Sequence, residues 1–100
     1  MPKFLIVYRS TTSPAEMFAT VTPQRQRAFV EKWRNWSDDL GGSLIDRGSL
    51  TRTVSDPSAD IIFGYAIVEA PDAQTVEQLL SLHPFVQAGG TAGVHECLMI

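Results

Sequence analysis

Residues 61–70, IIFGYAIVEA, decide the fold of this chain. The run has no charge before Glu69 and is rich in the β-branched and aromatic side chains that favour extended backbone. Because both of its faces are apolar, we predict a strand in the middle of a sheet, covered on both sides. Pro71 cannot donate to a strand ladder and Asp72 can cap free helical N–H groups, so a helix is predicted directly afterwards.

A long helix is predicted before this strand. Thr22 and Pro23 form a helix-start signal, because the hydroxyl caps free N–H groups and proline has no N–H to leave unpaired. Gly41 and Gly42 end the helix, since glycine tolerates the left-handed conformation found there. An apolar stripe at helical spacing predicts the face that packs on the core, with a ring-stacking ligand site as the alternative for its two tryptophans. The stripe consists of Phe29, Trp33, Trp36 and Leu40.

Two further strands and a loop are predicted around this helix. Residues 3–9 (KFLIVYR) form a second central strand, and residues 10–21 form a long loop with apolar anchors, functional or merely a surface excursion. Residues 43–54 form a polar edge strand that is bent at Gly48. The turn residues 56–58 (DPS) make this strand an antiparallel neighbour of residues 61–70.

A second helix and a last strand complete the chain. The helix spans residues 72–83, carries His83 on its apolar face and ends at Pro84, which excludes the helical conformation from the residue before it. Residues 92–100 (AGVHECLMI) form the last strand. Within that strand we predict that Cys97, the single cysteine, is a small buried side chain rather than a nucleophile.

The order β-α-β-β-α-β predicts one α+β domain over residues 1–100, with the split βαβ arrangement of ferredoxin-like folds. Such a domain is a four-stranded antiparallel sheet with both helices on one face. We expect the small residues of the central strand to face the helices: Gly64, Ala66, Val68 and Ala70. The larger residues then face the other way: Phe63, Tyr65, Ile67 and Glu69. Because no element covers that apolar face, we predict a two-fold homodimer with sheets back to back.

Composition excludes several classes of function. The 100 residues are 44% hydrophobic, carry a net charge of -3 and contain no basic cluster, so nucleic-acid binding is not expected. No apolar run reaches the roughly 20 residues that span a bilayer, and no signal peptide is evident, so we predict a cytoplasmic protein without membrane contact. No phosphate-binding glycine loop, dinucleotide fingerprint or metal-ligand spacing is present, so we expect no cofactor and no metal.

Four segments together resemble the YCII-related family, including its DGPF branch, over almost the whole chain. They are residues 42–50 (GSLIDRGSL), 64–70 (GYAIVEA), 83–89 (HPFVQAG) and 93–97 (GVHEC). The resemblance implies a small dimeric α/β barrel of the ferredoxin-like type. The wider group of dimeric barrels includes monooxygenases, isomerases and dehalogenases.

The resemblance is incomplete where it concerns chemistry. Some YCII-like members carry a histidine in helix one and an aspartate before the proline after helix two, proposed as an active-site pair. This chain has no histidine in the predicted helix, where Glu31 or Trp33 lies near that position, and His83 replaces the aspartate. The family's pair therefore cannot be transferred to this chain, and the four-residue DGPF motif is also absent.

Two functional hypotheses follow from the predicted topology. We expect Tyr8, Arg9, the 10–21 loop, His83 and His95 to gather at one edge of the sheet. In the first hypothesis the protein is a cofactor-free enzyme for a small organic molecule, anionic or neutral, with His83 as acid/base. Substrate is then bound by Tyr8, Arg9 and His95. A helix-end position would favour the cationic form of His83, and packing of its ring on Leu79 and Phe85 is the structural alternative.

The second hypothesis is a non-catalytic ligand-binding or accessory dimer. Its cleft would be lined by Phe18, Trp33 and Phe85 and would hold a small apolar molecule. The two hypotheses differ in what they predict for the structure. An enzyme requires polar groups that converge on a concave pocket, whereas a binding protein requires an apolar pocket without a paired histidine.

Overall fold

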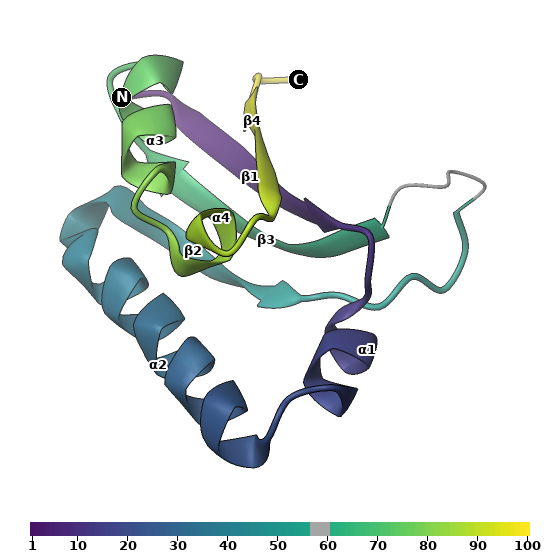
Figure 1. Ribbon diagram of the computed structural model, residues 1–100. Coiled ribbons are helices and arrows are strands. Elements are labelled where there is room, and N and C mark those ends of the chain that lie inside the picture. Colours follow the sequence, from purple (N-terminus) through teal and green to yellow (C-terminus); the bar gives the residue numbers. More distant parts are fainter. Residues whose placement is uncertain (57–60) are drawn as a thin grey trace.

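The computed structural model describes residues 1–56 and 61–100 and has a sheet covered by helices on one face (Figure 1). The strands are β1 Lys3–Ser10, β2 Leu44–Leu50, β3 Ile61–Glu69 and β4 Thr91–Glu96. They are antiparallel in the order β2-β3-β1-β4. The helices are α1 Pro14–Ala19, α2 Pro23–Asp39, α3 Ala73–Leu80 and α4 Pro84–Gln87, with a 3-10 turn η1 at Gly41–Ser43. The predicted ferredoxin-like α+β fold, with β1 and β3 central, is confirmed.

Strand β3 alternates between buried and half-buried residues from Gly64 to Glu69. Ala66, Val68 and the following Ala70 are buried among the helices, as predicted. The prediction for Phe63 was wrong, because this ring is fully buried in the same core. A register shift between Tyr8 and Arg9 leaves Phe63 without a partner on β1, so the alternation of faces that holds further along the strand does not reach it.

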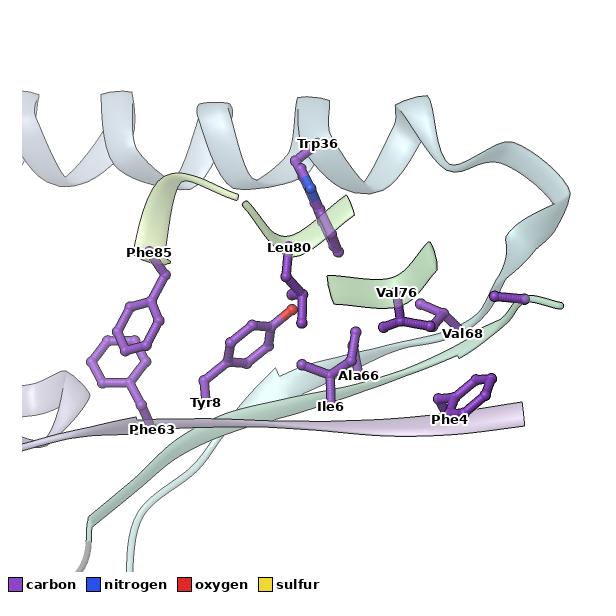
Figure 2. Close-up of a cluster of buried hydrophobic side chains, with 11 residues drawn as sticks. Phe4, Ile6, Tyr8, Trp36, Phe63, Ala66, Val68, Val76, Leu80 and Phe85 are labelled. Atoms are coloured by element: carbon purple, nitrogen blue, oxygen red, sulfur yellow. The ribbon is translucent and has the colours of Figure 1, made fainter. Parts of the chain in front are cut away.

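The core lies between the sheet and the helices (Figure 2). It draws side chains from every layer: Phe4, Ile6, Tyr8, Phe63, Ala66 and Val68 from the strands, and Trp36, Val76, Leu80 and Phe85 from the helices. Trp36 is anchored by a hydrogen bond from its indole N–H to the carbonyl of Leu79, 2.9 Å long. Phe29, Trp33 and Leu40 are half-buried against this core, which confirms the predicted apolar stripe of α2.

Helix caps fix where two of the helices begin. The Thr22 side chain accepts a hydrogen bond from the Arg25 N–H, and the Asp72 carboxylate accepts one from the Thr75 N–H at 2.8 Å. The hydrogen bonds from the N–H and the hydroxyl of Thr75 hold the pKa of the Asp72 carboxyl below its usual value. Both predicted helix starts are therefore confirmed.

The segment 10–21 is not the continuous loop that was expected, because it contains α1. Ser13 accepts a hydrogen bond from the Glu16 N–H, and its hydroxyl donates to the Glu16 carboxylate, both at 3.2 Å. Pro14 occupies the first helical position. This serine-to-glutamate capping pair with an intervening proline is a local helix-start signal that was overlooked.

The second helix is shorter than predicted, and His83 does not belong to it. Helix α3 ends at Leu80, the chain turns, and His83 becomes the N-cap of α4. The physical reason is Pro84, which forces an extended conformation on His83 and then serves as the first residue of a new helix.

Two predicted strands also end early. Strand β2 stops at Leu50 rather than at residue 54, and β4 stops at Glu96. Cys97 therefore lies beyond the last strand and is exposed, so the prediction of a buried side chain was wrong. Of the turn expected at residues 56–58, positions 57 and 58 lie outside the described residues.

The bend predicted at Gly48 is confirmed. Its φ angle is +73°, and the register of β2 against β3 shifts between Asp46 and Ser49. The Asp46 carboxylate accepts a hydrogen bond from the Gly48 N–H at 2.8 Å, which stabilises the bulge.

Among the helices that the structure describes, none is long and apolar enough to cross a lipid bilayer.

Candidate functional site

An apolar cleft of about 160 Å³ lies between α1, α2 and β2. Its walls are mostly aromatic and aliphatic, and we refer to it as the apolar cleft. The lining residues are Phe18, Phe29, Val30, Trp33, Arg34, Ser37, Arg47, Gly48, Ser49, Leu50 and Tyr65.

The aromatic wall of the apolar cleft is held in place by helix periodicity. Phe29 and Trp33 are four residues apart on α2 and therefore share a face, where their rings meet edge to face at 5.7 Å. Trp33 is supported from below by Phe63, with ring centroids 6.3 Å apart. Phe18 joins them from α1. Such a rigid, ring-lined cleft suits a flat apolar ligand.

Positive charge borders the apolar cleft. Arg47 pairs with Asp38 at 3.2 Å, and both side chains are largely exposed to solvent. Arg34 forms no ion pair with any residue in the described ranges. Two guanidinium groups therefore lie beside the cleft, and Arg47 is the one held in an ion pair among the described residues, which favours a ligand with an anionic group that contacts Arg34.

A second, more polar cleft of about 520 Å³ lies where β1 ends and β4 begins, and we refer to it as the polar cleft. Its lining combines hydroxyl groups and a guanidinium with an apolar floor. The residues are Arg9, Ser10, Thr11, Thr12, Met17, Phe29, Ile61, Phe85, Ala88, Gly89, Gly90 and Thr91. A concavity thus exists at the edge where the topology predicted one, with Arg9 and part of the 10–21 segment in its wall.

His83 lies in the core and lines neither cleft. Its side chain has no exposed surface, and its ring contacts Tyr8 at 4.9 Å, Trp33 at 4.3 Å and Trp36 at 4.4 Å between centroids. Nδ1 accepts a hydrogen bond from the N–H of Phe85 at 3.0 Å, so the proton of the neutral ring sits on Nε2.

Burial shifts the pKa values of two side chains in the core, His83 and Tyr8. It lowers the pKa of His83 from 6.5 to about 4, so the ring is neutral at pH 7. The expectation of a favoured cation was wrong, because His83 caps the start of α4 instead of ending α3 and lies out of water. Burial also raises the pKa of the Tyr8 hydroxyl. Within the described residues, Tyr8 Oη and His83 Nε2 are the buried side-chain polar atoms without a hydrogen-bond partner.

His95 lies apart from the other candidates. It pairs with Leu5, which alternates with the core residues Phe4 and Ile6 and so faces away from the helices. The register places Thr91, four residues earlier in β4, opposite Arg9. The expectation that His95 joins Arg9 at one edge was wrong because β4 begins at that edge and His95 lies further along it.

The structure thus divides the predicted site residues among four places. Phe18 and Trp33 meet in the apolar cleft, Arg9 lies in the polar cleft, Tyr8 and His83 lie in the core, and His95 is exposed on the far face. Phe85, expected beside Phe18, lines the polar cleft instead.

Sequence reasoning missed Phe29, Arg34 and Arg47 as cleft residues. Helical spacing from Trp33 could have identified Phe29. No local pattern brings Arg47 of β2 beside α2, because that approach depends on the packed sheet.

Within the described ranges, no group of three or more potential metal-ligating side chains occurs.

Comparison with known proteins supports the fold. The chain matches no protein-family model and no curated protein. It is similar in structure to 5-chloro-2-hydroxyhydroquinone dehydrochlorinase from Burkholderia phenoliruptrix AC1100, solved in complex with 2,5-dihydroxybenzoquinone. The TM-score is 0.55 at 19% sequence identity, and the match covers 91% of this chain and 90% of the other. This likeness supports the fold described above, a four-stranded antiparallel sheet with helices on one face.

Proposed function

We propose that this protein binds a small, ring-bearing organic anion in the apolar cleft. The observation that carries the proposal is the aromatic wall of Phe18, Phe29 and Trp33 with two guanidinium groups beside it. A flat ring packs against such a wall, and a carboxylate or acidic hydroxyl pairs with Arg34. The dihydroxybenzoquinone bound by the structural neighbour, a ring with acidic hydroxyls, belongs to the same chemical class and supports this choice.

The aromatic wall and the arginine beside it should contribute separately to ligand binding. With benzoate as the probe, we expect Arg34→Gln to weaken binding about tenfold, as expected when a hydrogen bond between charged groups is lost. We expect Phe18→Ala to weaken it about fivefold through lost ring contacts. Isothermal titration calorimetry measures both, and Trp33 in the wall provides a fluorescence signal.

Arg25→Gln is the matched control for charge, because Arg25 is exposed on the same helix and lies outside the apolar cleft. It should bind benzoate like the wild type. Equal affinity in all three variants, or no binding by the wild type, would contradict the proposal.

A second candidate function, a cofactor-free enzyme, is favoured by the two unpartnered atoms Tyr8 Oη and His83 Nε2. Trp33 lines the apolar cleft and its ring lies 4.3 Å from that of His83 between centroids, so a ligand in the cleft reaches the imidazole only if the Trp33 indole moves. His83 would then act as acid/base, with Tyr8 and Arg9 as anchors. The same protein samples, assayed for chloride release from 5-chloro-2-hydroxyhydroquinone, separate the two functions: turnover that His83→Gln abolishes supports catalysis, and benzoate binding without turnover supports binding alone.

The protein functions as a homodimer in this proposal, through the sheet face that the helices leave open. Leu5, Val7 and Ile67 lie on that face, and such a row of apolar side chains suits a symmetric sheet-to-sheet contact.

Light scattering after size-exclusion chromatography should give twice the 11.0 kDa mass of the chain. We expect Ile67→Glu to give the monomer mass, because it places charge in the contact. Leu82→Glu is the control, since Leu82 is exposed in the turn between α3 and α4. A wild-type monomer would overturn the dimer without affecting the ligand proposal.

A further inference from the structure

The apolar and polar clefts meet at one side chain. Phe29 lines both of them, and no other residue within 1–56 and 61–100 does. The adjacent residues Met17 and Phe18 of α1 are also divided, with Met17 in the polar cleft and Phe18 in the apolar cleft. The apolar cleft and the polar cleft are therefore neighbours, with α1 alongside both and the Phe29 ring between them.

The apolar cleft runs along α2 from Phe29 to Ser37. Ser37 and Arg34 lie toward its C-terminal end, and Phe29 lies eight residues before Ser37, which corresponds to about 12 Å of helix. Arg34 lies five residues after Phe29 on α2, so a ring whose anionic group contacts Arg34 can place its opposite edge against Phe29. A substituent attached to that edge of the ring would enter the polar cleft.

The lining of the polar cleft includes neutral hydroxyl groups that can form hydrogen bonds with a ligand. The hydroxyls of Ser10 and Thr12 lie 3.4 Å apart, and the Thr91 hydroxyl donates a long 3.4 Å bond to the carbonyl of Arg9. Threonine and serine hydroxyls both donate and accept, and weak exposed bonds of this length exchange readily for bonds to a ligand. Hydroxyl or amide groups on a ligand fit this lining.

We infer that the two clefts form one site for a two-part ligand: an anionic ring in the apolar cleft joined, past the edge of Phe29, to a neutral hydrogen-bonding arm in the polar cleft. This inference rests on the proposed function and specifies its ligand class. A simple aromatic acid would occupy half of the site, and the complete ligand would be an aromatic acid with a hydroxylated or amide-bearing substituent opposite its acidic group.

A series of benzoates that carry a para hydroxyalkyl ether of increasing length tests the inference by calorimetry. We expect affinity for the wild-type protein to rise once the hydroxyl reaches Thr91. The isosteric variant Thr91→Val should lose about fivefold affinity for the long ethers, as expected for one neutral hydrogen bond, and bind benzoate unchanged. Thr53→Val is the control, because Thr53 is exposed and lines neither cleft.

The outcomes separate the two proposals. Affinity that does not change along the series, or a Thr91→Val variant that binds the long ethers like the wild type, would overturn the two-part site while benzoate binding persists. Failure of benzoate and of every ether to bind would instead overturn the proposed function itself. A one-to-one stoichiometry for the long ether, in competition with benzoate, is the expected result.

Discussion

Replacing Gly48 with alanine is expected to destabilise the fold by about 3 kcal/mol or more, a loss typical of backbone strain in a packed region. A Cβ atom at this position would lie 1.7 Å from the carbonyl oxygen of Tyr65 and 2.5 Å from its carbonyl carbon. These are main-chain atoms of the central strand β3, so they cannot move without breaking the ladder. The φ angle of +73° adds about 1–2 kcal/mol for any residue with a side chain.

Two other glycines separate the contributions to this effect. Gly41 has a φ angle of +55° but open space around it, so Gly41→Ala should cost only the conformational part, about 1 kcal/mol. Gly42 has open space and no such φ angle, so Gly42→Ala should change stability little or raise it slightly. Urea denaturation of the three variants measures the differences. Equal losses at Gly48 and Gly41 would contradict the clash with Tyr65.

Acid is expected to destabilise the protein through His83. Its pKa is about 4 in the folded chain and 6.5 as the ordinary value, so between these pH values the unfolded chain binds the extra proton. The contribution of His83 to stability is therefore fully present above pH 6.5 and is lost as the pH falls toward 4. The loss corresponds to about 3 kcal/mol. The free energy of unfolding, measured by urea titration across this range, should show the decrease.

His83→Gln is the variant that removes this titration. It should be less stable than the wild type at pH 7, because the aromatic cluster around it loses a ring, but its stability should change much less between pH 7 and 4. Parallel pH profiles for the wild type and His83→Gln would show that another group is responsible.

Much of the fold was predictable because its determinants are local. The threonine and aspartate caps, the glycines after α2 and the apolar run of β3 each act within a few residues, and the structure has them as predicted. The errors arose where a local rule met a competing one. Proline after His83 both ends one helix and begins another, and the capping pair of Ser13 and Glu16 lies within a segment whose threonines and serines suggested a loop.

The candidate site was less predictable because it depends on contacts between distant segments. The shift in register after Tyr8 is a property of two paired strands and decides that Phe63 enters the core. The approach of Arg47 to α2 likewise requires the completed sheet. His83 illustrates the remaining difficulty, because its sequence context is that of an exposed helix end, whereas packing of Trp33 and Trp36 over its ring removes it from water.

The strand order has a consequence for synthesis of the chain. Strand β1 is made first, yet its two neighbours in the sheet are β3 and β4, which begin at Ile61 and Thr91. While the intervening residues are being translated, β1 is an apolar segment without any partner, and β2 has none either. Folding of the sheet therefore waits for the second half of the chain, and during that interval the segment FLIVY is the part of the nascent protein that most needs protection from aggregation.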